Sequence, residues 1–435
     1  MFSLIIRIFK DAATTLLRNS ILIALIAGPL MGYGQSTIIN PFPASPDPDR
    51  VVLNVTQDPS TSLAVNWRTC DTVRSGFAEI MPVTADPRDA ARALRLQAIT
   101  TPFTIENISV SYHSIIIDKL QPATRYMYRV GAGDHWSEWF HVKTAGKSGD
   151  KLSFIYFGDV QAGIKSFWSG VVRQAYTRMP DANVIMYAGD IVNRGRKDAE
   201  WGELFYAGNF IHSMIPGMMS PGNHEYDDNA QGVNELTSLW RAQFTLPENG
   251  PAGLEETCYF TDVQGVRFIS LNSQAIWFGG EMMQKEIDWL QKILKNNPNK
   301  WTCVIFHHPV FSIKANRDNE NMREKFQPIF NQYKVDLVLQ GHDHAYARGM
   351  KNMPMPHEKD VSGTMYIVSV SGAKMYEENK QPWMDKSGDH TQLYQLVTVD
   401  QNILTYKSYT AAGELFDSFQ LKKRRSGINK LKELK

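Results

Sequence analysis

The sequence predicts an α/β domain preceded by a smaller all-β domain. From about residue 47 to residue 147, short runs with period-two alternation are separated by Gly, Pro, Asp and Asn, which is typical of β-strands joined by turns. From Leu152 onward, apolar strand-like runs alternate with helical patterns, which is typical of α/β layers. The 435 residues are enough for two or three domains.

The first 34 residues are predicted to be a secretory signal peptide. Arg7, Lys10 and Arg18 precede an apolar run over residues 21–31, and the small and polar GYGQS follows. The run is short for a membrane span. We therefore expect cleavage near Gly34 or Gln35 and a periplasmic or extracellular protein that has no stable membrane span. An uncleaved membrane anchor is the alternative. Residues 35–46 are predicted to be a linker.

Residues 47–147 are predicted to form a β-sandwich, since about seven short strands in ~100 residues are typical of that fold. In SLAVNWRT, the alternation directs Leu63, Val65 and Trp67 to one face and the residues between them to the other. LQPATRY, residues 120–126, is typical of a tyrosine corner, in which the Tyr126 hydroxyl bonds to upstream backbone. An ordinary core tyrosine is the alternative.

Residues 148–423 are predicted to form the α/β domain. LSFIYFGD and NVIMYAGD flank a helix candidate, SFWSGVVRQAYTRM, and residues 281–295 place Met283, Ile287, Leu290 and Leu294 at helical spacing. Three or four further strands follow in the last ~70 residues. Residues 424–435 are predicted to be a basic C-terminal tail.

Charge and cysteine content exclude some functions. The formal net charge of +1 provides no bulk field for nucleic acid or an anionic membrane. Cys70, Cys258 and Cys303 are too widely spaced for a zinc finger. We expect Cys258 and Cys303 to be buried free thiols, and one disulfide stays open.

Five apolar runs end in residues of the types that commonly bind metals: Asp159, Asp190, His224, His307 and His342. Ligands of open α/β sheets bind at the carboxyl ends of the strands, so these side chains are expected to converge. A four-residue string such as GNHE occurs by chance at roughly one position in 10⁵. The ordered set therefore predicts one metal site.

The strings GDVQ (158–161), GDIVNRG (189–195), GNHE (222–225), VIFHHP (304–309) and GHDHAYAR (341–348) resemble those of calcineurin-like metallophosphoesterases, and within them the purple acid phosphatase branch. The region 47–147 resembles the fibronectin type III-like leading domain of that branch. The resemblance implies a four-layer αββα sandwich that hydrolyses phosphate esters as an acid phosphatase does. A phosphodiesterase or nucleotide hydrolase is the nearest alternative, and a catalytically degenerate surface-binding protein is another.

The resemblance also implies two metal ions, Fe, Mn or Zn, bridged by Asp190. One ion would be bound by Asp159, Asp190, His344 and Gln161, and the other by Asp190, Asn223, His307 and His342. Paired ions clamp the oxygens of an in-line displacement and lower the pKa of a bound water from 15.7 toward about 7.

Other residues have less certain roles. By resemblance, His224 stabilises the transition state or protonates the leaving group, and Arg194 binds phosphate unless it forms a structural salt bridge. His308 contacts substrate, orients a ligand or packs. Glu225 is interpreted as support for a ligand, and Tyr346 and Arg348 as support for their loop.

Two positions depart from the family pattern. Purple members carry a tyrosine ligand where this chain has Asn193, so we expect no tyrosinate band. Non-purple relatives carry a histidine where it has Gln161, whose neutral amide oxygen favours Mn, Mg or Fe(II); alternatively, Gln161 does not ligate. The expected partner is a small phosphorylated substrate selected by rim loops near 227–253 and 350–363, and the oligomeric state stays open.

Overall fold

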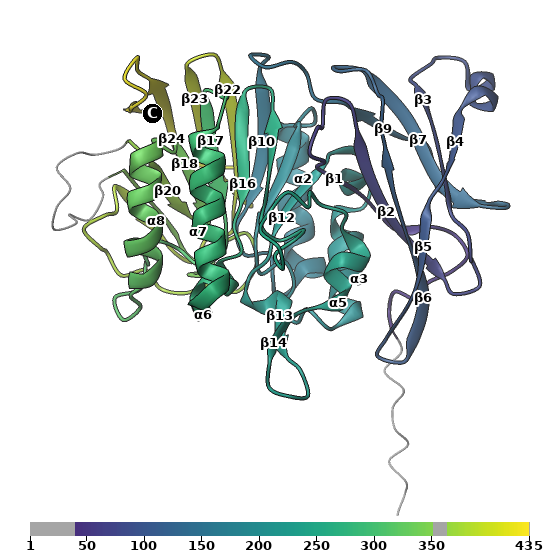
Figure 1. The fold of residues 1–435 in the computed structure, drawn as a ribbon, viewed down its shortest axis with the longest axis horizontal. Helices are drawn as coiled ribbons and strands as arrows, with labels where there is room; N and C mark the ends of the chain where they lie inside the picture. Colours follow the sequence, from purple (N-terminus) through teal and green to yellow (C-terminus); the bar gives the residue numbers. More distant parts are fainter. Residues whose placement is uncertain (1–39, 351–362, 435) are drawn as a thin grey trace, which may run out of the picture. The chain divides into compact units, whose positions relative to one another are not determined.

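The computed structural model describes residues 40–350 and 363–434 (Figure 1). The expected signal peptide, its cleavage site, part of the linker and most of the loop near 350–363 lie outside these ranges. Within the described residues, no helix is both long and apolar enough to cross a bilayer.

The predicted all-β region is made of two packed sheets. Strands β3, β4, β7, β8 and β9 form one sheet, and β1, β2, β5 and β6 line up in the other. The strands are β1 (Asp49–Asn54), β2 (Leu63–Cys70), β3 (Phe77–Pro82), β4 (Leu94–Gln97), β5 (Ile99–Ile105), β6 (Ile108–Ile117), β7 (Arg125–Ala132), β8 (His135–Trp136) and β9 (Phe140–Lys143), with a 3₁₀ turn, η1 (Pro87–Arg92), before β4. Leu63, Val65 and Trp67 are buried between the sheets, as the alternation predicts. The backbone N–H of Gln121 donates to the Tyr126 hydroxyl at 2.9 Å, which confirms the tyrosine corner.

The opposite face of β2 is buried as well, because it packs on the α/β domain. Arg50 and Arg68 both reach Asp198, at 2.8 and 3.1 Å, and all three side chains are almost fully buried. β1 also runs beside a strand of the α/β domain, β12 (Gly217–Ser220), where Asn54 pairs with Gly217 in parallel. The two domains therefore share one continuous sheet.

That sheet has eleven strands in the order β25-β24-β23-β22-β10-β11-β12-β1-β2-β6-β5. Its remaining strands are β10 (Leu152–Phe157), β11 (Val184–Ala188), β22 (Leu393–Asp400), β23 (Ile403–Thr410), β24 (Leu415–Lys423) and β25 (Asn429–Glu433). A second sheet has the order β15-β16-β17-β18-β20-β19-β21. Its strands are β15 (Tyr259–Val263), β16 (Val266–Ser270), β17 (Trp301–Ile305), β18 (Leu337–Gln340), β19 (Tyr346–Gly349), β20 (Met365–Val368) and β21 (Lys386–Gly388).

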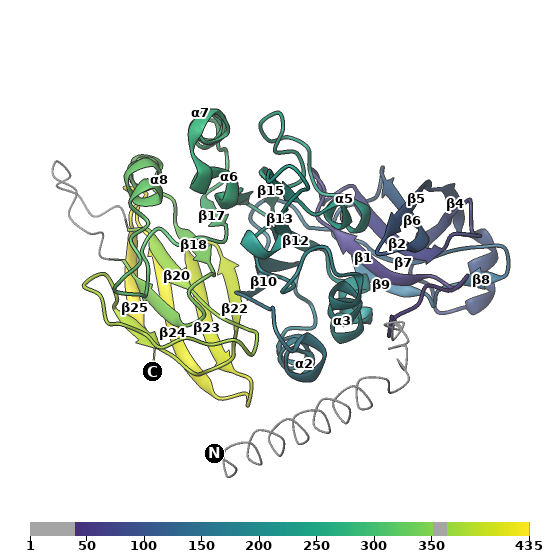
Figure 2. The same ribbon diagram turned by 90° about the horizontal axis from the view of Figure 1, so that it is seen from below.

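Helices cover the outer faces of both sheets, which gives the expected four layers (Figure 2). Phe154 and Phe268 meet edge-to-face between the sheets, with ring centroids 5.2 Å apart. The helices are α2 (Ser169–Arg178) after a π-helical turn, η2 (Ile164–Trp168), then α3 (Asp198–Gly208), α4 (Phe210–Met214), α5 (Ser238–Gln243), α6 (Ser273–Phe278), α7 (Gly280–Lys295) and α8 (Glu320–Tyr333). A short turn, η3 (Asn223–Glu225), and a hairpin, β13 (Tyr226–Asp228) with β14 (Asn234–Leu236), complete the domain. The helix predicted over 281–295 is α7, which buries Ile287, Leu290 and Leu294.

The C-terminal segment corrects one prediction. Residues 424–435, expected to be a basic tail, contain β25, which pairs antiparallel with β24. Leu431 packs against the main core, and the Glu433 carboxylate lies 2.6 Å from Arg348, so the segment is anchored on both faces. The charges are on a strand rather than a free tail.

All three cysteines are free, and Cys258 and Cys303 are buried, as expected.

Candidate metal centre

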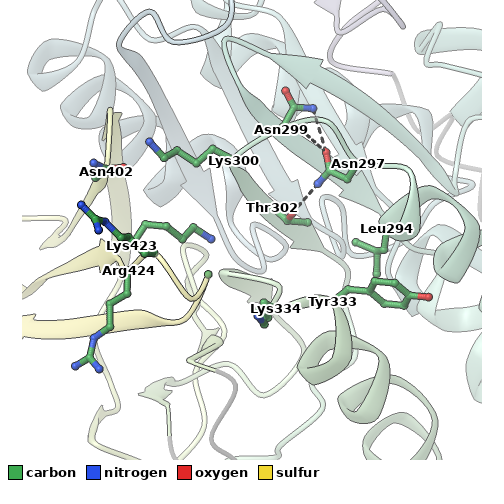
Figure 3. Close-up of a pocket in the computed structure, with 12 residues that line it drawn as sticks. Leu294, Asn297, Asn299, Lys300, Thr302, Tyr333, Lys334, Asn402, Lys423 and Arg424 are labelled. Carbon is green, nitrogen blue, oxygen red and sulfur yellow. Dashed lines mark hydrogen bonds between the residues drawn. The ribbon is translucent and has the colours of Figure 1, made fainter.

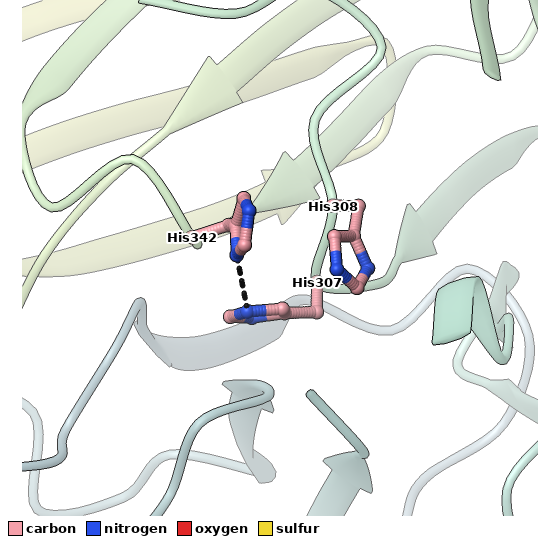
Figure 4. Close-up of side chains that lie close together, drawn as sticks. All are labelled: His307, His308 and His342. Atoms are coloured by element: carbon pink, nitrogen blue, oxygen red, sulfur yellow. Dashed lines mark hydrogen bonds between the residues drawn. The ribbon is translucent and has the colours of Figure 1, made fainter. Parts of the chain in front are cut away.

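The seven predicted metal ligands come together where β10, β11, β17 and β18 end, beside the turn that follows β12. Around His307, the Nε2 atom lies 3.2 Å from both Asp190 Oδ2 and Asn223 Oδ1. His342 Nδ1 lies 3.0 Å from the same His307 nitrogen (Figure 4). Four of the predicted ligands, Asp190, Asn223, His307 and His342, therefore surround one point; we call them the histidine half.

A second group shares Asp190. Ligand atoms of Asp159, Asp190 and His344 all lie within 4.8 Å of one another. The Gln161 amide nitrogen donates to Asp190 Oδ2 at 2.9 Å and to His344 Nε2 at 3.1 Å. We call Asp159, Gln161, Asp190 and His344 the carboxylate half.

The carboxylate half contains buried acceptors without a donor. Asp159 Oδ1 and Gln161 Oε1 are both buried and accept no hydrogen bond among the described residues. Unpaired buried oxygens cost free energy, and a cation is one means of satisfying them. Burial raises the pKa of Asp159 to about 8. Burial alone would lower the pKa of His307, but the Asp190 and Asp159 carboxylates raise it to about 9. The cluster therefore favours a bound positive charge, and its carboxylate, imidazole and amide groups are suitable metal ligands.

The backbone holds these ligands in unusual conformations. Asp190, His342 and His344 have φ angles of 47°, 73° and 49°, in the left-handed region that non-glycine residues rarely adopt. Such strain persists only where the surrounding structure enforces it, and it concentrates at functional sites. Gly222 also approaches closely, since a Cβ there would lie 2.2 Å from Asp190 Oδ1. This contact explains the glycine of GNHE.

Hydrogen bonds orient two of the imidazoles. His307 Nδ1 donates to the Ala188 carbonyl at 2.9 Å, and His344 Nδ1 donates to the Lys374 carbonyl at 2.8 Å. Each ring therefore directs its Nε2 into the cluster, the orientation that a metal-binding histidine needs. His344 Nε2 already accepts a hydrogen bond from the Gln161 amide, whereas a metal ion would displace the proton that the raised pKa keeps on His307.

Glu225 secures the loop that carries Asp190. Its carboxylate is fully buried and accepts backbone N–H groups from Asp190, Ile191, Val192 and Gly222 at 2.7 to 3.2 Å. All of its bonds go to backbone, so the structure agrees with the supporting role predicted for it.

His224 lies at the edge of the cluster. Its Nδ1 donates to the Asn193 carbonyl at 2.6 Å, and its Nε2 is 3.8 Å from Asp190 Oδ2. The side chain keeps 25% of its surface exposed, so it is open to solvent beside the ligands. Asn193, the residue at the missing tyrosine position, therefore contributes a carbonyl that orients this histidine.

His308 is held by helix α6. The Ser273 hydroxyl accepts the His308 backbone N–H at 3.0 Å and lies 2.9 Å from His308 Nδ1. Trp277, one helical turn later, stacks on the His308 ring at 5.2 Å. The His308 ring also lies 4.4 Å from the His342 ring. Sequence analysis missed Ser273 and Trp277; their spacing of four predicts a common helix face, but nothing in the sequence links that face to His308.

Arg194 is not part of the cluster. Its Nε forms a 2.6 Å ion pair with Glu200, and the side chain is 61% exposed. The structure thus favours the salt bridge over the predicted phosphate contact. Tyr346 and Arg348 both contact Asp417, at 2.6 Å, and so support their loop as expected.

Comparisons with known proteins agree with this fold. The profile of the calcineurin-like phosphoesterase family matches residues 152–346, and that of the purple acid phosphatase N-terminal domain matches residues 48–144. The chain therefore carries a calcineurin-like phosphoesterase domain behind a purple acid phosphatase N-terminal domain.

Particular relatives refine this class. Acid phosphatase type 7 of Homo sapiens is 26% identical over 375 residues, covering 77% of this chain and 80% of the human protein. Purple acid phosphatase 21 of Arabidopsis thaliana is 28% identical over 266 residues, covering 60% of this chain and 58% of the plant protein. These homologues support a phosphoric ester hydrolase.

Two solved structures share the fold. The purple acid phosphatase PPD1 from yellow lupin (Lupinus luteus) seeds superposes with a TM-score of 0.70 at 19% identity, covering 88% of this chain and 75% of the lupin chain. A structure of PhoD superposes with a TM-score of 0.64 at 14% identity, covering 90% of this chain and 92% of its own. Both support the α/β fold with an N-terminal β domain.

Proposed function

We propose that the chain is a metal-dependent phosphomonoesterase of the acid phosphatase type that acts outside the cytoplasm on a small phosphorylated substrate. The observation that carries the proposal is the sharing of Asp190 by two groups of buried and half-buried candidate ligands. Asp159, Gln161, Asp190 and His344 would bind one metal ion, and Asp190, Asn223, His307 and His342 the other. Bound there, two cations would supply positive charge to the phosphoryl oxygens and lower the pKa of a water, so that it could lose a proton and attack as hydroxide.

His224 is the residue we propose for proton transfer to the leaving group. Its Nδ1–H is committed to the Asn193 carbonyl, so only Nε2 can exchange a proton with substrate. The partial exposure of the ring gives a leaving group access to it.

We propose that His308 donates a hydrogen bond to the phosphoryl group rather than binding metal. The Ser273 hydroxyl already accepts the His308 backbone N–H, so its own proton is available for His308 Nδ1. The ring proton is then on Nε2, which cannot serve as a metal ligand. Burial, together with His307, holds the pKa of His308 well below its usual value, so the ring is a neutral donor.

The alternatives differ in what the same site would accept. A phosphodiesterase or nucleotide hydrolase could use the same ligands, since substrate choice depends on the rim loops. A degenerate binding protein is disfavoured because the described ligand cluster is complete apart from the Asn193 and Gln161 positions.

The test is metal analysis of the purified protein, followed by hydrolysis rates on an aryl phosphate and a bis-aryl phosphate after reconstitution with Mn, Fe or Zn. We expect two metal ions per chain, a preference for the monoester and no strong visible band, because Asn193 replaces the tyrosine. A preference for the diester would favour the alternative enzyme. Absence of metal and of both activities would leave the binding protein.

A further inference from the structure

A pocket (Figure 3) lies beside the starts of β17 and β18, and the opposite ends of these strands lie at the metal cluster. It has a volume of about 500 Å³. Three parts of the chain build it: the connection from α7 into β17, the end of α8, and the turns that join β22 to β23 and β24 to β25. Because β17 and β18 end at the metal cluster and begin near this pocket, a ligand here would be separate from the reacting phosphate.

The wall of this pocket is strongly basic. Five of its twelve lining residues are cationic, and none is a carboxylate. The five are Lys300, Lys334, Lys423, Arg424 and Arg425. For a chain with a net charge of +1, this is a local concentration of positive charge.

Two of the cations are used by the fold. The Lys423 ammonium pairs with the buried Asp336 and lies 4.7 Å from the centre of the Trp301 ring. Lys334 donates to the Ser426 carbonyl at 2.6 Å, which fixes the turn between β24 and β25. These contacts hold two of the five cations in place.

The other three cations are uncommitted. Among the described residues, the side chains of Lys300, Arg424 and Arg425 form no hydrogen bond or ion pair. Like charges in a concave site repel one another and focus a positive field, which a multivalent anion would relieve. The arginine fork fits phosphate oxygens, and the neighbouring amides of Asn299 and Asn402 add further donors.

We propose that this basic pocket binds a compact polyanion that carries at least two phosphate groups. More than one group is required because the cations come from separate segments and the volume exceeds that of a single phosphate. The phosphates could belong to a free oligophosphate or to a lipid headgroup, and both present the same chemistry to the pocket. The proposal does not depend on the activity of the metal cluster.

The test is isothermal titration of the full chain with inorganic tripolyphosphate, in the presence of a chelator so that no metal remains to bind it. We expect saturable binding by the wild type. The double variant Arg424→Glu, Arg425→Glu should weaken this binding at least ~10-fold and reduce its dependence on salt. The control is the double variant Arg173→Glu, Lys407→Glu, which changes charge equally at two exposed positions; it should bind as the wild type does.

Co-sedimentation with vesicles that contain a polyphosphorylated lipid distinguishes the two sources. Binding to the vesicles but not to tripolyphosphate identifies a headgroup, and binding to tripolyphosphate alone identifies a free anion. In either case the Arg424 and Arg425 variant must lose the binding and keep aryl phosphate hydrolysis. Wild type that binds neither probe, or an equal loss in both double variants, overturns the proposal.

Discussion

The two halves of the metal cluster share Asp190 but differ in how their ligands are satisfied. In the histidine half, His307 Nε2 lies within 3.2 Å of three other ligand atoms, on Asp190, Asn223 and His342. In the carboxylate half, Asp159 Oδ1 and Gln161 Oε1 accept no hydrogen bond from any residue that the structure describes, and Gln161 directs its nitrogen toward Asp190 and His344.

This difference shows how one altered ligand changes half of a site. An amide nitrogen cannot bind a cation, so Gln161 ligates only when its amide is turned to present the oxygen. The histidine half needs no such rearrangement. We therefore expect the carboxylate half to bind its metal more weakly.

The largest effect is expected from the ligand common to both halves. Asp190→Ala should lower kcat/KM for an aryl phosphate by ~10³-fold or more and reduce bound metal, because several kcal/mol of charge stabilisation are lost. Steady-state rates and metal content measure this. Asp181→Ala, the same change at a carboxylate that is 86% exposed, is the control. Normal rate and metal content in Asp190→Ala would exclude a shared site.

The comparison itself is tested by one substitution in each half. Asn223→Ala should lower activity by ~10²-fold. Gln161→Ala should lower it by ~10-fold or less, because the Gln161 amide directs its nitrogen toward the cluster and must turn before its oxygen can bind a metal ion. Metal content measured by mass spectrometry at increasing chelator shows which ion leaves first. A loss in Gln161→Ala equal to that in Asn223→Ala would show that the halves depend equally on their amides.

Glu225→Gln should weaken both halves together, because Glu225 holds the loop of the shared ligand. A glutamine side chain keeps only one acceptor oxygen, and its NH₂ group would face backbone N–H groups that the carboxylate now accepts. Each buried N–H group that loses its acceptor costs about 1–3 kcal/mol of folding free energy. We expect ~10 to 100-fold weaker metal binding and a lower melting temperature. Selective loss of one ion would contradict this role for Glu225.

The last prediction concerns the stability of the fold rather than the metal site, and it separates acid unfolding from metal loss. His212 is buried against Tyr187, and burial lowers its pKa from 6.5 to about 4. The unfolded chain therefore binds an extra proton between these values. Above pH 6.5, His212 is neutral in both the folded and the unfolded chain, and its contribution to the free energy of unfolding is fully present. As the pH falls toward 4, proton uptake by the unfolded chain removes about 3 kcal/mol of this free energy.

Unfolding of the metal-free protein at pH 7 and pH 4 measures this dependence. His212→Gln should flatten it, and His135→Gln, the same change at a half-exposed position, is the control. An unchanged dependence in His212→Gln would assign the acid sensitivity to other groups.

Local patterns predicted which side chains form the cluster and predicted most strands, because both leave a short-range signature. Asp159, Asp190 and His307 follow apolar runs, and the tyrosine corner of Tyr126 is contained in seven residues. Other outcomes depend on which partner the fold brings close. Arg194, for which a salt bridge was the open alternative to phosphate binding, pairs with Glu200. Residues 424–435, predicted to be a tail, contain a strand that pairs with β24.

Contacts between distant segments could not be predicted from the sequence. Trp277 reaches His308 only because the tertiary fold places helix α6 beside it. Arg68 follows the alternation of its strand, but its buried partner, Asp198, is 130 residues away. Sequence periodicity reports which face a residue occupies, but not which element covers that face.

The parallel pairing of β1 with β12 has a practical consequence for any attempt to isolate the catalytic domain. A chain that began at Leu152 would leave one side of β12 with unpaired backbone groups, an open edge that invites other chains to add to the sheet. It would also leave the Asp198 carboxylate without its two ion-pair partners, Arg50 and Arg68. Such a fragment should aggregate, so the boundary that is visible in the sequence is not a place where the protein can be cut.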